Sequence, residues 1–491
     1  MSTYYKVVSS SAAAAEFVGE KHIQDKGRIS LHIFRRIFSN LYTLTSSIKP
    51  MQNLVHLCHK EIIKKIASNY KKDRNDYKYI EKYLTVQQVA LETQCREKGI
   101  NIDSWVFSIE NRRIIREIMV FIEENMRFII EMPITEQYFC LVNYIKEQEK
   151  LRTKIWDLDV EYPEDLIRKI PEMTEYAKYC VGIYGHYMGR VSIKKHLKSI
   201  LTGLSNKEVF MKYTNTSTNS LVYSKGNSFM HLPGHAVIVS EEKKAIIVVI
   251  RGTKSFFDCI ADLNSEYTNY TTRGITGKLH SGIYKSSVNL SNTLKPIIIK
   301  NLLLYPDYEI IILGHSLGAG CASLLSLIWL DDEDINKFPI KCYAYAPPSV
   351  ISENLNKLLK GIVISCSNKD DIVPRLSLGS ILDLCNIIEF LYKQDLSISC
   401  ECLYEKSQEM CKEEKIYPPG DVFQIFDETD ISIDDDNFDD KRGKKKCKEF
   451  NAGFVRNDFY GNILFSKNML FDHEAPSYEE ALKKFVRKYF G

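Results

Sequence analysis

A short motif near the middle of the chain has the residue types and spacing of a serine nucleophile. Its sequence is Gly-His-Ser-Leu-Gly, residues 314–318, and it follows the aliphatic run 310–313. When a buried strand turns sharply into a helix, a serine at the turn is presented to substrate. Gly314 and Gly318 fit such a turn because bulkier neighbours would clash there. The pattern therefore predicts that Ser316 attacks an acyl carbon.

A serine nucleophile requires a histidine that takes its proton and an acid that orients the histidine. Where the serine stands on a strand–turn–helix motif, the acid and then the histidine follow it along the chain. His473 is the single histidine after Ser316, so it is the expected base. Asp370 and Asp371 both follow the predicted strand 362–366. Spacing alone admits either as the acid, although we expect Asp370 to cap a turn.

Acyl transfer places negative charge on the carbonyl oxygen, and hydrogen-bond donors set in advance must stabilise that charge. Leu317, directly after the nucleophile, supplies one backbone N–H at a turn of this kind. Thr253, in the sequence Arg-Gly-Thr after the predicted strand 245–250, is the expected second donor. His315 is predicted to be structural, because neighbouring side chains at the turn point in different directions. This chemistry requires neither a metal ion nor an organic cofactor.

The chain around these residues alternates between strand and helix patterns. The β-branched runs 236–239 and 245–250, joined by the charged residues 241–244, predict a hairpin. Further along the chain we expect helix 280–303, strand 309–313, helix 318–330, strand 340–345 and strand 362–366, in this order. Such alternation predicts an α/β class with a largely parallel central sheet covered on both faces.

The α/β pattern is divided along the chain and preceded by a different region. Residues 1–170 are expected to form a helical N-terminal region, with its clearest apolar face at 114–129. The core is expected at 171–383 and again at 451–491. The second part carries His473 and a C-terminal helix at 478–490.

Residues 384–450 are expected to form a flexible charged insert between the acid and the base. Eight acids lie between Asp427 and Asp440, and six bases follow between Lys441 and Lys448. Charge blocks of this kind are usually solvated. Because of its position, we expect the insert to control access to the site, so that its deletion would raise activity or alter the dependence on the lid.

Composition limits the class of protein and its location. The 491 residues correspond to about three folding units at roughly 150 residues each. With 44% hydrophobic residues and a net charge of +3, the chain reads as globular, with no electrostatic reason to expect nucleic acid. No signal peptide is visible, and no apolar run reaches the roughly 18 residues of a transmembrane helix. A cytoplasmic location, with at most peripheral membrane contact, is expected.

The cysteines support a reducing compartment. There are 13 of them, an odd number, and they are scattered along the chain. Cys400, Cys402 and Cys411 are clustered, but no histidine lies near them at a zinc-like spacing. We therefore expect three free thiols in the insert, with a metal site as the alternative.

Taken together, these residues resemble the class 3 lipase family. The similarity covers residues 233–377 and 469–482 and rests on four motifs: Arg-Gly-Thr at 251–253, His-Ser-Gly-Ile at 280–283, the serine motif with its following Ala-Gly, and Asp-Ile-Val-Pro-Arg at 371–375. The sequence Cys-Tyr-Ala-Tyr-Ala-Pro-Pro at 342–348, with Asp472, His473 and Tyr478, is similar to the sn-1-specific diacylglycerol lipase branch.

The resemblance implies an α/β-hydrolase fold and assigns roles to particular residues. Asp371 would be the acid and His473 the base, with Thr253 and Leu317 as the oxyanion hole. Residues 255–278 lie where the family carries its lid, and residues 384–450 lie where the diacylglycerol lipases carry a regulatory insert. Unlike the animal diacylglycerol lipases, this chain shows no predicted transmembrane bundle in its N-terminal region.

The expected activity is hydrolysis of diacylglycerol to a monoacylglycerol and a fatty acid, at a membrane or lipid-droplet surface. Phospholipase A1 and monoacylglycerol lipase are alternatives, because the lid and the pocket decide between such substrates. A catalytically silent lipid-binding or scaffold protein is a rival of another class. An incomplete set of catalytic residues would favour that rival, and here the set is complete in sequence.

Overall fold

The computed structural model describes residues 134–151, 160–187, 204–226, 228, 231–253, 266–393, 406–426 and 452–491. The chain divides into two compact units, Met1–Val142 and Asn143–Gly491, and the second contains the α/β pattern. The helix expected at 114–129 and the thiols Cys400 and Cys402 lie outside the described residues. Within the described part of the chain, no helix has the length and apolar character to cross a bilayer.

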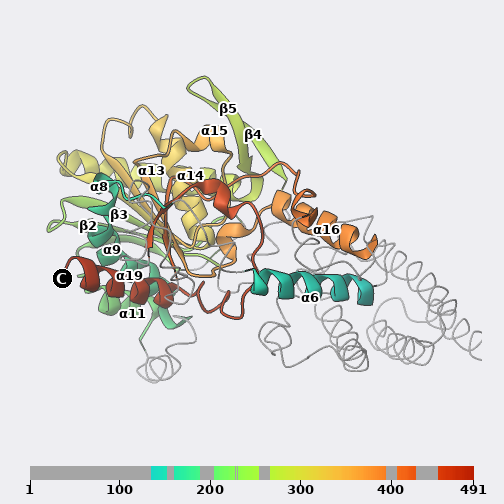
Figure 1. Cartoon of the computed structure of the whole chain (residues 1–491). Helices are drawn as coiled ribbons and strands as arrows, with labels where there is room; N and C mark the ends of the chain where they lie inside the picture. The colour runs from blue at the N-terminus through green and yellow to red at the C-terminus, as the bar shows by residue number, and fades with distance from the viewer. Residues whose placement is uncertain are drawn as a thin grey trace, which may run out of the picture. The chain divides into compact units, whose positions relative to one another are not determined.

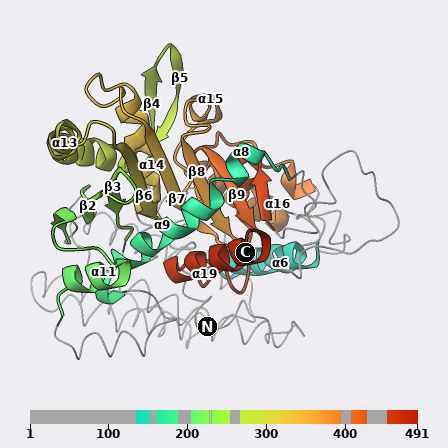
Figure 2. The ribbon, with the colours of Figure 1, turned by 90° about the vertical axis from the view of Figure 1, so that its left-hand side faces the viewer.

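An eight-stranded sheet forms the centre of the second unit (Figures 1 and 2). In spatial order its strands are β1 (Leu221–Lys225), β2 (His235–Ser240), β3 (Ala245–Ile250), β6 (Glu309–His315), β7 (Ile340–Tyr345), β8 (Val363–Asn368), β9 (Asp421–Ile425) and β10 (Ala452–Val455). The five strands from β3 to β9 are parallel, whereas β1, β2 and β10 pair antiparallel at the two edges. The predicted hairpin and the largely parallel sheet are both confirmed.

Helices cover both faces of this sheet, and strand β3 shows why. All six of its side chains are buried: Ile246, Val248 and Ile250 pack toward α13 (Ser281–Leu304) and α14 (Leu317–Leu330). The alternate side chains Ala245, Ile247 and Val249 pack toward α9 (Ile170–Gly182) and α19 (Ala475–Tyr489). A strand buried on both faces must be apolar at every position, which explains its unbroken aliphatic sequence. This arrangement confirms the α/β-hydrolase fold.

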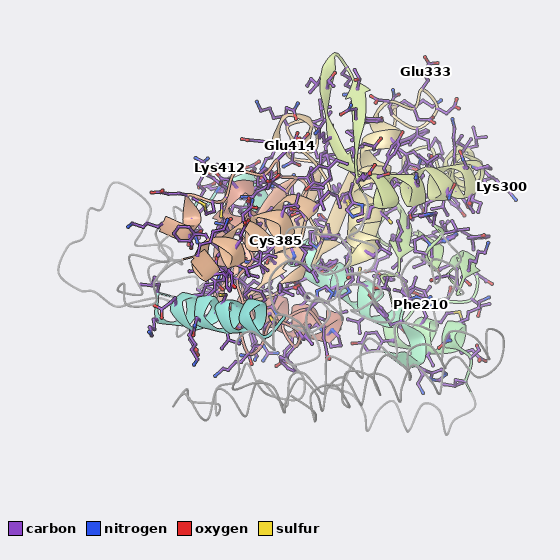
Figure 3. The ribbon with its side chains drawn as sticks, turned by 90° about the vertical axis from the view of Figure 1, so that its right-hand side faces the viewer. Phe210, Lys300, Glu333, Cys385, Lys412 and Glu414 are labelled. Carbon is purple, nitrogen blue, oxygen red and sulfur yellow. The ribbon has the colours of Figure 1, made fainter. Side chains whose placement is uncertain are left out.

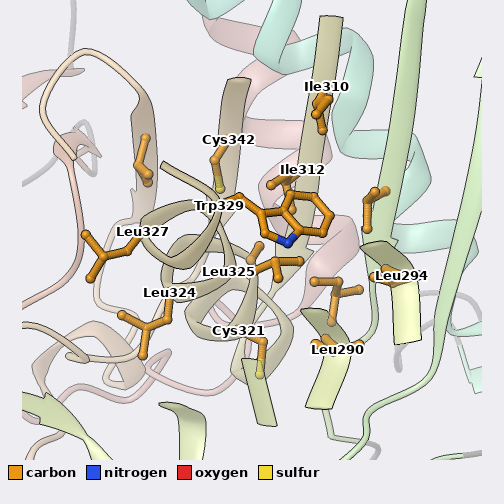
Figure 4. Close-up of a cluster of buried hydrophobic side chains, with 14 of the residues drawn as sticks. Leu290, Leu294, Ile310, Ile312, Cys321, Leu324, Leu325, Leu327, Trp329 and Cys342 are labelled. Carbon is orange, nitrogen blue, oxygen red and sulfur yellow. The ribbon is translucent and has the colours of Figure 1, made fainter. Parts of the chain in front are cut away.

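The face covered by α13 and α14 contains the largest buried side chain of the described core. Trp329 of α14 is fully buried against Leu290 and Leu294 of α13 and Ile312 of β6 (Figure 4). Its indole N–H donates to the Ser291 hydroxyl at 2.9 Å, so the buried polar atom has a partner. The contact fixes the helix that begins at the nucleophile motif against its neighbour.

Part of the segment expected to be a lid forms a β-hairpin. Strands β4 (Tyr267–Thr272) and β5 (Ile275–His280) pair antiparallel, and the positive φ of Arg273 and Gly274, 49° and 76°, makes the tight turn between them. The hairpin is held against the rest of the unit: Tyr267 Oη accepts the Gly379 N–H at 2.8 Å. Residues 254–265 lie outside the described residues, so the lid stays a prediction.

The predicted boundaries of the charged insert are wrong. Residues 378–393 form helix α16 (Leu378–Lys393), and β9 lies between β8 and β10 in the central sheet. The strand was missed because Asp-Val-Phe-Gln-Ile is short and charged segments surround it; its neighbours in the sheet determine its conformation. Deleting residues 384–450 would remove this strand, so that deletion cannot isolate a regulatory effect. Residues 394–405 and 427–451 lie outside the described residues.

A buried ion pair fastens α16 to the chain that leads into β9. Lys415 Nζ lies 2.6 Å from Asp383 Oδ2, and their side chains are 12% and 2% exposed. The Glu413 N–H also donates to Asp383 Oδ1 at 3.0 Å. Figure 3 labels Cys385 on α16 and, farther up in this view, the exposed residues Lys412 and Glu414. This part of the expected insert is therefore packed.

The N-terminal boundary of the core also lies earlier than residue 171. Glu161 forms an antiparallel bridge with Phe454 of β10, and α9 begins at Ile170, whose side chain is buried on the sheet. The remaining described helices are α6 (Ile134–Lys150), α8 (Glu164–Ile167), η4 (Gly185–Tyr187), α11 (Asn206–Thr214), α15 (Glu353–Asn356), η6 (Val373–Arg375) and η7 (Asn457–Tyr460). Helix α9, which ends at residue 182, therefore belongs to the core, and the core begins within the helical region expected at 1–170.

Two neighbouring leucines of α13 test this packing. Leu302 is 1% exposed in the sheet-facing cluster, whereas Leu303 is 78% exposed. Because a buried truncation leaves a cavity, Leu302→Ala should lower the free energy of unfolding by about 2–5 kcal/mol, and Leu303→Ala by less than about 0.5 kcal/mol. Urea denaturation measures both values. Equal losses would contradict the described orientation of α13.

Candidate active site

Ser316 stands at the sharp turn between β6 and α14. Its backbone angles are φ 58° and ψ −130°, a conformation that residues with a side chain rarely adopt. The turn leaves no room for side chains at the two glycines. A Cβ on Gly314 would lie 2.2 Å from the Gly318 carbonyl oxygen, and one on Gly318 would lie 2.3 Å from the Ile250 oxygen. Because backbone atoms approach both positions so closely, the motif requires glycine at residues 314 and 318.

His473 reaches this serine from a distant part of the sequence. It lies in the loop just before α19, and its Nε2 is 3.0 Å from Ser316 Oγ. Helix α19 is fixed on the sheet by Tyr478 and Leu482, which are 1% and 0% exposed. The packing of this helix therefore sets the position of the loop that carries the imidazole.

Asp371 is the carboxylate that faces the other side of the His473 ring. His473 Nδ1 lies 3.0 Å from Asp371 Oδ1 and 2.9 Å from Oδ2. The carboxylate also accepts the Tyr478 hydroxyl at 2.6 Å and the Val373 N–H at 2.9 Å. Spacing left Asp370 and Asp371 open; of the two, Asp371 contacts His473. Asp370 instead accepts the Ser466 hydroxyl at 2.5 Å.

The parallel register brings these side chains to one edge of the sheet. Ser316 follows β6 and Asp371 follows β8, and the carboxyl ends of parallel strands meet at the same edge. Ile250 of β3 pairs with Gly314 of β6, so Thr253 and Leu317 each lie three residues beyond a paired position. A Cβ on Gly252 would lie 3.1 Å from Ser316 Cβ, which places the Thr253 loop directly beside the serine.

The ring nitrogens of His315 bond to groups other than the side chains of Ser316 and Asp371. Its Nε2–H donates to the His473 carbonyl oxygen at 2.8 Å, and its Nδ1 lies 2.9 Å from the Tyr184 hydroxyl. Burial, and then the neighbouring His473, hold the pKa of His315 well below its ordinary value. The ring is therefore neutral.

A carboxyl next to His473 in the sequence, that of Asp472, has an altered pKa. Asp472, 3% exposed, has its pKa raised to about 7, by burial first and then by the charge of Asp370. Its Oδ2 accepts the Asp370 N–H at 3.3 Å, and its carbonyl oxygen accepts from the Asn368 side chain at 3.1 Å. These bonds tie the loop before α19 to the end of β8.

Two tyrosines around the site had different sequence signals. Tyr478 was noticed only through the family resemblance, and no motif explained its bond to Asp371. Tyr184 had no signal at all, because it lies far from the serine motif and outside the residues that resemble the family. Tyrosine is common in cores, so only the assembled fold identifies the partner of its hydroxyl.

Comparison with known proteins gives an independent result. The family model "Lipase (class 3)" matches residues 247–380, which include the serine motif and the acid loop. This segment belongs to the class 3 lipase family. The match extends from β3, before the Thr253 loop, into the beginning of α16. His473 and Tyr184 lie outside the matched residues.

The chain is also similar to individual lipases. Diacylglycerol lipase-beta of Mus musculus is 29% identical over 171 residues, which are 32% of this chain and 25% of that protein. Diacylglycerol lipase-alpha of Homo sapiens is 28% identical over 178 residues, 34% of this chain and 17% of that protein. The lipase of Rhizopus oryzae is 34% identical over 92 residues, 18% of this chain and 23% of that protein. The chain thus spans a quarter or less of each relative.

Among solved structures, the Rhizomucor miehei lipase propeptide complex aligns with this chain at a TM-score of 0.35 and 18% identity. The alignment covers 53% of this chain and 70% of that one.

The close contact at the nucleophile turn can be tested by a single methyl group. In Gly318→Ala the Cβ would lie 2.3 Å from the Ile250 backbone oxygen, whereas a Cβ on Gly226 has nothing within 4 Å. We expect Gly318→Ala to lower the free energy of unfolding by about 1–3 kcal/mol and Gly226→Ala by less than about 0.5 kcal/mol. Thermal unfolding followed by circular dichroism measures the difference. Equal melting temperatures would contradict the close approach of β3 to the turn.

Proposed function

We propose that this protein is a serine hydrolase that cleaves acyl ester bonds of glycerolipids. The observation that carries the proposal is the continuous hydrogen-bonded chain from Ser316 through His473 to Asp371. It joins three side chains with the types and distances that nucleophile, base and orienting acid require. Membership of residues 247–380 in the class 3 lipase family supports lipid esters as the substrate class.

The proposed reaction has two halves. Ser316 Oγ attacks the ester carbonyl carbon while His473 Nε2 takes the hydroxyl proton, and the alcohol leaves with that proton. Water then attacks the acyl-enzyme, with His473 again acting as base, and releases the fatty acid. Asp371 accepts from His473 Nδ1–H, which fixes the tautomer whose Nε2 is free to take the proton. The cycle returns every proton and needs no further reactant besides water.

The oxyanion would be stabilised by two loops. Leu317 opens α14, so its N–H is one of the unpaired donors at a helix N-terminus. Thr253 follows Gly252, whose missing side chain lets this loop approach Ser316. We propose the backbone N–H groups of Leu317 and Thr253 as the oxyanion hole, which contributes roughly 3 kcal/mol per donor to the transition state.

Diacylglycerol is the substrate that we propose first. The support comes from the first two relatives named above, which are diacylglycerol lipases. Phospholipid and monoacylglycerol are the competing substrates. A lipid substrate implies that the enzyme works at a membrane or lipid-droplet surface, so we propose peripheral contact with such a surface. The catalytically silent rival is disfavoured because the three side chains lie within hydrogen-bonding distance.

Fatty-acid release from diacylglycerol, triacylglycerol, monoacylglycerol and phosphatidylcholine tests both parts of this proposal. We expect release from diacylglycerol to be fastest and Ser316→Ala to lower it about 1,000-fold or more, because the acyl-enzyme can no longer form. Ser323→Ala is a matched control, since that hydroxyl is buried on α14 and bonds to the Ala319 carbonyl. Release that survives Ser316→Ala would contradict the serine mechanism. Fastest release from phosphatidylcholine would instead favour a phospholipase.

A further inference from the structure

The His315 ring lies between two parts of the site that the chain does not connect directly. Its own backbone precedes Ser316, and its Nε2–H donates to the carbonyl oxygen of His473 at 2.8 Å. The two imidazole rings are 5.0 Å apart at an angle of 40°. The loop that carries His473 is thus bonded to the turn that carries Ser316.

The hydrogen-bond partners fix the tautomer of this ring. A carbonyl oxygen can only accept, so Nε2 of His315 must carry the proton. Its Nδ1 is then an acceptor, and the Tyr184 hydroxyl, 2.9 Å away, must donate to it. His315 is buried, at 4% exposure, so both bonds are shielded from water.

Tyr184 links this ring to two further elements. It follows the last turn of α9, and its ring packs with Ala475, the first residue of α19. Its hydroxyl also lies where a Cβ on Gly252 would stand, at 2.4 Å. One side chain therefore contacts His315 and the start of the helix after the base, and fills the space beside the loop that carries Thr253.

We propose that Tyr184 and His315 are positioning residues that hold the carbonyl of His473 at a fixed distance from the Ser316 turn. Asp371 bonds to the imidazole of His473, whereas the His315 ring bonds to the backbone that carries it. The inference rests on the proposed function, because it concerns the position of His473, the proposed base. A merely structural role would affect folding without a selective effect on the chemical step.

The test separates the two bonds of the ring by substitution. His315→Asn keeps a polar group near Nδ1 and loses the Nε2–H donor, whereas His315→Gln places an amide N–H near the Nε2 position. We expect His315→Asn to lower kcat roughly 10- to 100-fold with KM unchanged, because small displacements of a catalytic group are costly. We expect kcat of His315→Gln to be close to the wild-type value. Diacylglycerol hydrolysis and the rate of Ser316 labelling by a small fluorophosphonate are the two readouts.

Tyr184→Phe tests the proposal independently of the histidine. It keeps the ring and removes the hydroxyl donor, so we expect labelling and kcat to fall about 5-fold. Tyr179→Phe is the matched control: Tyr179 lies on α9, shortly before Tyr184, and its ring packs against Phe210, so we expect its variant to be fully active. Thermal unfolding of each variant shows whether the fold is retained.

Distinct outcomes separate failure of this inference from failure of the proposed function. If the wild type neither labels at Ser316 nor hydrolyses the lipid, the proposed function fails. If the wild type is active and folded Tyr184→Phe labels at the wild-type rate, the positioning role is overturned. Equal losses of kcat in His315→Asn and His315→Gln, with equally lowered melting temperatures, would also contradict the positioning role. They would show that His315 contributes to packing alone.

Discussion

The strained turn at Ser316 constrains much of what surrounds it. A serine at φ 58° and ψ −130° is held in a sparsely populated conformation, which costs about 1–3 kcal/mol and persists only where neighbours enforce it. The neighbours here are backbones: the turn touches the ends of β3 and β6 at distances that exclude any Cβ on Gly314 or Gly318. The aliphatic strands and the helix packed through Trp329 supply the burial that offsets this strain.

The rest of the site depends on the order of the sheet. Because β3, β6, β7, β8 and β9 run parallel, the loops after β3, β6 and β8 open at one edge. His473 comes from outside this series, in the loop before α19, and its position depends on how that helix packs. Tyr478 links α19 to the Asp371 carboxylate. Its buried side chain packs α19 on the sheet, and its hydroxyl donates to Asp371.

Much of this could be read from the sequence, for reasons that are local. A buried parallel strand must be apolar, so β3 and β6 were predictable, and the serine turn needs its glycines. The count of histidines after Ser316 selected His473, whereas spacing could not separate Asp370 from Asp371, because only the turn after Asn368 decides which carboxylate faces the ring. β9 was missed because its five residues depend on sheet neighbours, and Tyr184 because a hydroxyl's partner is a tertiary property.

The most direct test of the account compares two neighbouring carboxylates. Asp371→Asn and Asp370→Asn change one atom each at adjacent positions, yet the described geometry gives only Asp371 a bond to His473. Measured on the substrate that the wild type hydrolyses fastest, kcat should fall roughly 10,000-fold in Asp371→Asn, because the histidine loses its orienting acceptor. Asp370→Asn should stay within about 10-fold of the wild type. Full activity in Asp371→Asn, with a large loss in Asp370→Asn, would contradict the account.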